Sequence, residues 1–173
     1  LSYWNDGLVI VDVGNGIRGG SPSSPQLVSQ YKYDLNELYR DVEATGGPGF
    51  IRGTHTAWRH NQYVFIADEV FPAAAVKGAR DAAAFRAYGR MQVIDVTDLF
   101  HPRAVAWYEP EYGGVHNVWV AGDTLYLGAY NAGFRAFDID VFDEKDHSWN
   151  VLEKSPPLNN QRRAFSTFKK ITV

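Results

Sequence analysis

The amino-acid sequence predicts an all-β fold assembled from repeated units of four antiparallel strands. Similar segments recur in the same order along the chain. The segments HTAWRHNQYVFIAD and HNVWVAGDTLYLGA begin at His55 and His116 and match at the same offsets. The segments LVIVDV, MQVIDV and FRAFDI contain Asp12, Asp95 and Asp138 at equivalent positions, and PQLVSQY resembles PRAVAWY. Because self-similarity in a fixed order is typical of stacked supersecondary units, each copy is expected to form one such unit.

Each unit divides into four short strands joined by turn residues. The first strand begins at the histidine, and the second, YVFIAD or TLYLGAY, is dense in β-branched and aromatic residues. The third is LVIVDV or its copies, and the segments NDG (5–7) and NAG (131–133) predict tight turns before it, because Asn and Gly tolerate positive φ. The fourth is LVSQYKY or AVAWYEP. Most strands are continuous apolar runs, so both faces are expected to be buried. Such units are typical of β-propeller blades; a β-sandwich of unrelated strands is the alternative.

The repeats predict one β-propeller segment, residues 1–173, that is incomplete. It divides into a partial blade (1–34), a blade with an insertion (54–111, insertion 70–89), a blade (114–155), and a tail or start of a further blade (156–173). Propellers typically have four or more blades. We therefore expect either a fragment of a longer propeller or a chain whose open edges a partner covers.

Two insertions are expected to lie on one face of the molecule. Residues 35–53 join a fourth strand to a first strand, and they predict a short helix capped by Asp34 with Glu37 at the third position. Residues 70–89 join a second strand to a third and are helix-prone at 73–75 and 81–88. In a four-stranded meander these two connections emerge on the same side. Insertions in repeat proteins often form the binding face.

Composition excludes several classes of function. A net charge of -3 gives no footprint for a polyanion, so no nucleic-acid partner is expected. The absence of cysteine excludes disulfides, thiolate metal sites and thiol nucleophiles. No apolar run approaches the roughly 20 residues that a membrane-spanning helix needs, so no transmembrane segment is expected in this chain. Association with a membrane-bound complex stays open.

Three segments also resemble a known family. GLVIVDV, MQVIDVTDLFHP followed by AVAWY, and HNVWVAGDTLYLGAY resemble the LVIVD-repeat β-propeller proteins of bacteria, over roughly residues 1–140. The resemblance implies a propeller that is exported from the cytoplasm, to the periplasm or the cell surface. It implies no particular activity.

The binding face is predicted from residues near the insertions and the hairpin turns. His55 and His116 begin equivalent inner strands near the propeller axis. A shared metal ion is not expected, because equivalent positions on adjacent blades should lie about 10 Å apart, whereas each nitrogen bound to one ion lies about 2 Å from it. A structural histidine bonded to a turn or a neighbouring blade is the alternative. The predicted binding face comprises Trp4, His55, Asp68, Glu69, Arg90, His116 and Tyr130.

Asp68, Glu69 and Arg90 flank the second insertion. Carboxylates beside an arginine are able to perform acid–base chemistry if they are buried together, and an ion pair that anchors the loop is the alternative. Trp4 and Tyr130 precede the hairpin turns at equivalent positions, where aromatic residues anchor partners or pack between blades.

Other polar patterns are given structural explanations. Asp12, Asp95 and Asp138 end third strands, where a carboxylate accepts backbone N–H bonds and fixes the next turn. The glycine pattern at 14–19 is followed by SPSSP, so no helix begins there to receive a dinucleotide phosphate. The acidic residues at 138–144 lack the glycine and terminal Glu of an EF-hand loop.

Together these features predict a non-catalytic scaffold or interaction module without a cofactor. It is expected to bind a protein partner as a subunit of an extracytoplasmic assembly. The alternative is part of a propeller hydrolase with a metal-assisted site at the channel mouth. No nucleophile elbow, phosphate loop or HExxH motif is present, which favours the non-enzymatic interpretation.

Overall fold

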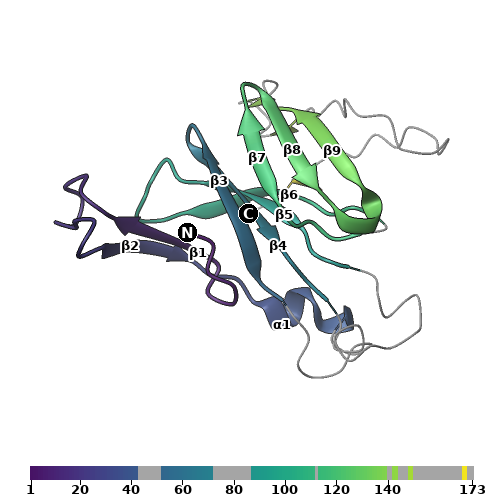
Figure 1. Cartoon of the computed structure of the whole chain (residues 1–173), viewed down its shortest axis with the longest axis horizontal. Helices are drawn as coiled ribbons and strands as arrows, with labels where there is room; N and C mark the ends of the chain where they lie inside the picture. Colours follow the sequence, from purple (N-terminus) through teal and green to yellow (C-terminus); the bar gives the residue numbers. More distant parts are fainter. Residues whose placement is uncertain are drawn as a thin grey trace.

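The fold is built from antiparallel sheets, as the sequence predicts. The computed structural model describes residues 1–42, 52–71, 87–111 and 113–139, with the backbone of 142–143, 148–149 and 169–170. Three principal sheets stand side by side, and none of them closes on itself (Figure 1). Among the described residues, no helix is long and apolar enough to cross a membrane.

The middle sheet is an antiparallel meander. Its strands follow chain order: β3 (Thr54–His60), β4 (Tyr63–Asp68), β5 (Met91–Asp95) and β6 (Arg103–Tyr108). The first two strands are the expected first and second strands of the repeat, and the next two are its third and fourth. A short strand from the tail, β12 (Lys169–Lys170), pairs with β6 at the outer edge.

The two flanking sheets contain the other copies of the repeat. β1 (Leu8–Asp12) pairs with β2 (Gln26–Tyr31), which are the third and fourth strands of the first copy. β7 (Val118–Ala121), β8 (Thr124–Gly128) and β9 (Phe134–Asp138) are the first three strands of the last copy. The short strands β10 (Phe142–Asp143) and β11 (Ser148–Trp149) pair with each other.

The middle sheet is buried on both faces because each face packs on a neighbouring sheet. All six residues of β4 are buried. On one face Phe65, Met91 and Val93 pack against Leu127 and Phe137 of the last sheet. The opposite face packs on the first sheet; the residues of this second cluster include Leu8, Ile10, Val64, Ile66 and Ile94. This two-sided burial explains the continuous apolar run of β4, YVFIAD.

The described ends of the two insertions contact each other. Asp34 caps α1 (Leu35–Leu38) by accepting hydrogen bonds from two backbone N–H groups, those of Asn36 and Glu37, so the predicted cap is confirmed. Leu35 and Tyr39 pack against Val70, and Val70 pairs with Tyr88 across the second insertion. The helix-prone segments at 73–75 and 81–86 lie outside the described residues. Figure 1 shows α1 beside the ends of β3 and β4.

The tight turns form where they are expected, with Gly at positive φ as predicted, but an aromatic residue rather than Asn takes the other positive-φ position. Trp4 has φ 44° and Gly7 φ 74°, and their counterparts Tyr130 and Gly133 have φ 45° and 78°. The Gly7 and Gly133 N–H groups donate to the carbonyls of Trp4 and Tyr130, at 3.0 and 2.9 Å. An aromatic residue therefore opens each turn at positive φ, a strain of roughly 1–2 kcal/mol that its surroundings must offset. The prediction that Asn adopts this conformation is wrong.

Phe65→Ala should test the two-sided core. Phe65 is 0% exposed, so removing its ring should lower the free energy of unfolding by about 3–5 kcal/mol. Trp58→Ala is the matched control, because Trp58 pairs with Phe65 across the same sheet and is 44% exposed. Denaturant unfolding of both variants measures the difference. Equal losses at the two positions would contradict the packing described.

Candidate functional site

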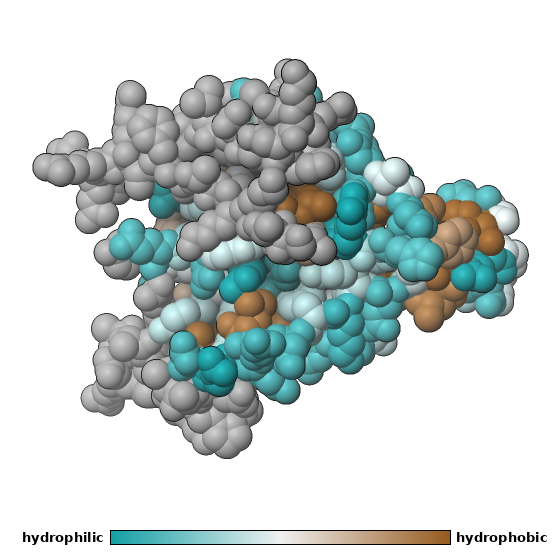
Figure 2. Space-filling view, turned by 180° about the vertical axis from the view of Figure 1, so that it is seen from behind, coloured by the Kyte–Doolittle hydropathy of each residue, from teal (hydrophilic) through white to brown (hydrophobic). Residues whose placement is uncertain are grey.

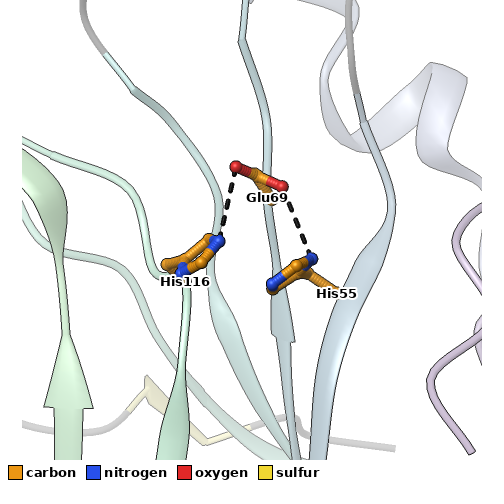
Figure 3. Close-up of side chains that lie close together, drawn as sticks. All are labelled: His55, Glu69 and His116. Carbon is orange, nitrogen blue, oxygen red and sulfur yellow. Dashed lines mark ion pairs between the residues drawn. The ribbon is translucent and has the colours of Figure 1, made fainter.

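A cluster of two histidines and one glutamate forms where three strands of neighbouring sheets meet. His55 is the second residue of β3, Glu69 follows the last residue of β4, and His116 lies two residues before β7. Because successive side chains of a strand point to opposite faces, Glu69 points toward the last sheet while its neighbour Asp68 points the other way. In Figure 3 the Glu69 carboxylate lies beside the pair of imidazole rings, and a dashed line joins it to each ring.

The two histidines are much closer together than the sequence argument allows. Their ring centroids are 4.0 Å apart and the rings are stacked at 24°. His55 Nδ1 lies 3.4 Å from Glu69 Oε2, and His116 Nε2 lies 3.5 Å from Glu69 Oε1. The expected separation of about 10 Å is wrong because it applies to the faces of two packed sheets. β3 and β7 are instead edge strands that meet: Thr56 Oγ1 donates to Asn117 Oδ1 at 2.9 Å.

The backbone around His116 is held by close approaches that require glycine. The His116 N–H donates to the Gly128 carbonyl at 2.9 Å, and the Val115 N–H donates to the Gly89 carbonyl at 3.2 Å. A Cβ atom at Gly114 would lie 1.9 Å from the carbonyl oxygen of Tyr88. Glycine at this position therefore allows the segment to cross the end of the second insertion and deliver His116 to the cluster.

The two strained aromatic residues contact the cluster from opposite sides. Trp4 lies edge-on to His55 at 5.6 Å between ring centroids, and Tyr130 lies edge-on to His116 at 5.2 Å. The Tyr130 hydroxyl donates a hydrogen bond to Glu69 Oε1. The backbone of Trp4 exchanges two hydrogen bonds with Thr54, at 3.0 and 3.1 Å. These contacts hold both residues at positive φ, so the strain coincides with the cluster.

The cluster is partly buried, and burial shifts the pKa of His116 and of the adjoining Tyr130. The side chains of His55, His116 and Glu69 are 29%, 30% and 16% exposed. Burial, followed by the charge of His55, lowers the pKa of His116, although Glu69 opposes this shift. Burial and then the hydrogen bond to Glu69 raise the pKa of Tyr130. Both shifts favour the uncharged forms, an imidazole at His116 and a hydroxyl at Tyr130.

The cluster brings two imidazole rings and a carboxylate close together. One ligand atom from each of the three residues lies within 4.8 Å of the others. Donors of this kind bind transition-metal ions.

Asp68 belongs to a separate buried network. Its carboxylate accepts hydrogen bonds from the hydroxyls of Tyr33 and Tyr39, the latter at 2.6 Å, and Thr54 Oγ1 lies at 3.4 Å. Tyr39 Oη in turn accepts the Arg90 N–H at 3.3 Å. The network fastens the first insertion to β4. Sequence reasoning missed these partners: the spacing of Leu35 and Tyr39 indicates a helix face, but nothing in it indicates Asp68.

Arg90 lies outside the cluster as well. Its guanidinium carbon stands 4.4 Å from the centre of the Trp107 ring, and Nη2 lies 3.8 Å from Glu109 Oε2. The acid–base group that the sequence suggested for Asp68, Glu69 and Arg90 is therefore not formed. Of the seven predicted binding-face residues, the structure brings together Trp4, His55, Glu69, His116 and Tyr130.

The repeated aspartates lie at strand ends, away from the cluster. Asp12 accepts four backbone N–H bonds, from Gly14, Asn15, Arg18 and Gly20. These bonds, that of Arg18 first, hold the pKa of Asp12 far below its usual range. Asp95 similarly accepts the Thr97 N–H and an Arg103 guanidinium bond, and Asp138 ends β9. The glycine-rich segment at 14–19 is thus a loop arranged around Asp12. Most of the acidic segment at 138–144 lies outside the residues whose side chains are described.

The outer faces of the two flanking sheets carry exposed apolar residues. Tyr126 and Phe134 occupy the repeat positions of Phe65 and Met91, yet Phe134 is 49% exposed where Met91 is 0% exposed. Trp119 stacks on Tyr126 with 5.2 Å between ring centroids and is 38% exposed. At the other end of the molecule, hydrophobic surface gathers on the β1–β2 sheet (Figure 2), where Leu27 is 60% exposed.

Stacked antiparallel sheets with this internal repeat indicate a repeat domain of the β-propeller type. Residues 2–33, which include β1 and β2, match the family model of the LVIVD repeat. The chain thus contains an LVIVD repeat, which confirms the resemblance noted in the sequence. No curated protein and no solved structure matches the chain.

Asp68→Asn should remove a specific pH dependence of stability. Burial outweighs the hydrogen bonds and raises the pKa of Asp68 to about 6 from an ordinary value of 3.8. The folded state therefore binds this proton more tightly than the unfolded state. The unfolding free energy of the wild type should rise, relative to Asp68→Asn, as the pH falls from about 6 to about 4. A two-unit shift corresponds to about 3 kcal/mol. Denaturant unfolding across this range measures it, and parallel pH profiles would refute the assignment.

Proposed function

We propose that the chain is a non-catalytic interaction module. It assembles by packing one of its sheets against a sheet of the same repeat type in another copy of the chain. The main support for this proposal is the outer face of the β7–β9 sheet, the face that points away from the middle sheet. Its residues occupy the positions that the middle sheet buries completely against its neighbour. Phe65, Met91 and Val93 of the middle sheet are 0% exposed. Their counterparts are Tyr126, Phe134 and Ala136, of which Phe134 is 49% exposed and Ala136 8% exposed. The exposed surface therefore centres on Phe134 and the neighbouring Trp119, which is 38% exposed.

The repeat also specifies the chemistry of the partner surface. Leu125, Leu127 and Phe137 contribute the face of the last sheet that covers the middle sheet. The matching face of the first sheet is its outer face, where Val11 stands at the repeat position of Phe137. This face is apolar, with Leu27 and Val13 60% and 45% exposed. The outer face of the β7–β9 sheet and the outer face of the β1–β2 sheet are called the two end faces. By repeat position they correspond to the two surfaces that pack together between neighbouring sheets within the chain.

A second copy of the chain is the partner that carries this surface. Because the two end faces differ, the contact is head-to-tail, and such contacts generate rings when the rotation closes and filaments when it does not. The rotation between successive sheets of a propeller favours ring closure. We also propose an exported location, in the periplasm or at the cell surface, which the resemblance to exported LVIVD-repeat proteins supports.

Phe134→Asp should weaken this association. A carboxylate in the centre of an apolar contact must be desolvated without a partner, so the apparent mass at a given concentration should fall toward 19.4 kDa. Sedimentation or light scattering over a range of concentrations measures the mass. Trp58→Asp is the matched control, because Trp58 is 44% exposed on β3 of the middle sheet, away from both outer faces, and it should leave the mass unchanged. A wild-type chain that stays monomeric at high concentration would overturn the proposal.

A further inference from the structure

We propose that His55, Glu69 and His116 bind one divalent transition-metal ion. The site lies where β3 and β7 begin and β4 ends. The ligands are His55 Nδ1, His116 Nε2 and the Glu69 carboxylate. This inference is independent of the proposed assembly, since the cluster lies between the middle and last sheets of a single chain.

The spacing of the donor atoms suits a shared ion. Zinc–nitrogen bonds are about 2.0–2.1 Å and zinc–carboxylate bonds about 2.0–2.2 Å, so neighbouring donors around a tetrahedral ion lie roughly 3.4 Å apart. The two histidine–carboxylate distances are 3.4 and 3.5 Å. One donor atom from each residue lies within 4.8 Å of the others. The two imidazole rings are stacked at 24°. Binding therefore requires the histidine side chains to rotate until both ring nitrogens point at the ion.

The donor set selects the class of metal. Two imidazoles and a carboxylate suit ions such as Zn²⁺, Cu²⁺ or Ni²⁺, whereas Ca²⁺ and Mg²⁺ prefer oxygen ligands. Three protein ligands leave a tetrahedral ion one open position, and the two histidines are about one third exposed, so solvent reaches the cluster. An open position of this kind is what the metal-assisted hydrolase alternative requires.

The repeat itself marks Glu69 as unusual. Glu69 follows His55 at the same spacing as Tyr130 follows His116, so the two residues occupy the same repeat position. Trp4 also corresponds to Tyr130, because each directly precedes the turn segment NDG or NAG. Two copies therefore carry an aromatic residue where the middle copy carries a carboxylate. Packing alone explains the aromatic residues, but it does not explain a partly buried carboxylate that contacts both histidines.

The surrounding residues orient the carboxylate. Tyr130 donates a hydrogen bond to Glu69 Oε1, and the Glu69 N–H donates to the Gly53 carbonyl at 2.9 Å. Hydrogen-bond partners of this kind fix the direction of a metal ligand, and their loss typically weakens affinity 10–100-fold. Tyr130 is thus a positioning residue for Glu69.

Calorimetric titration of chelator-treated protein with Zn²⁺ tests the proposal. We expect one ion per chain, at protein concentrations below those at which copies associate. Glu69→Gln and His116→Ala should each weaken binding by about 100-fold or more, and Tyr130→Phe by about 10-fold. His101→Ala is the matched control, because His101 bonds only Asp98 on an exposed loop; it should bind Zn²⁺ like the wild type. Mg²⁺ should not compete.

The spectrum of Co²⁺ gives a second readout that does not depend on stability. Tetrahedral Co²⁺ absorbs strongly in the visible range, and this absorption should appear in the wild type and disappear in Glu69→Gln, whose circular dichroism should remain that of the wild type. Failure of the wild type to bind Zn²⁺, or binding that Glu69→Gln and His116→Ala leave unchanged, would overturn the proposal. Either result leaves the assembly proposal intact, because that rests on the mass of the Phe134 variant.

Discussion

Packing of the middle sheet between two neighbours is the constraint on which the rest of the structure depends. Neither face of β3–β6 is polar enough to meet water, since Phe65 and Ile66, which point to opposite faces of β4, are both 0% exposed. Each face is therefore stable only when another sheet covers it. The same requirement, applied to the outer faces of the flanking sheets, leaves exposed apolar surface at both ends. The proposed assembly would cover this surface with the same kind of sheet-to-sheet contact.

The same packing brings the chemically active residues together. The stacked sheets converge along their first strands, so residues at equivalent repeat positions become neighbours, as the hydrogen bond between Thr56 and Asn117 shows. His55 and His116 meet for this reason. Glu69 is the one departure from the aromatic pattern at its position, and it lies where the convergence is closest. The repeat thus places the two histidines side by side, and the non-repeated Glu69 adds a carboxylate next to them.

Most of the fold could be predicted from the sequence because the strands and the helix cap depend on short-range sequence patterns. Strand positions follow from apolar runs, and the α1 cap follows from Asp34 and its spacing to Glu37. The distance between the two histidines could not be predicted in the same way. It depends on the angle at which the middle and last sheets approach each other at their edge strands β3 and β7. The partners of Asp68 were missed for a related reason: Tyr33 and Tyr39 reach it through tertiary packing, and no sequence spacing links them. The aromatic residues at positive φ also required the structure, since local preference favours Asn and Gly in such turns.

The convergence of β3 and β7 is the central claim, and a disulfide trap tests it most directly. The chain contains no cysteine, so Thr56→Cys combined with Asn117→Cys introduces only the two thiols of interest. Mild oxidation of the folded, dilute protein should form an intramolecular disulfide between them, detected by mass and by loss of free thiol, because the two native side chains are in hydrogen-bond contact at 2.9 Å. A pair of Thr56→Cys with Ala121→Cys, at the far end of β7, should remain reduced. Free thiols in the first pair after oxidation would contradict the convergence, and with it the origin of the histidine–glutamate cluster.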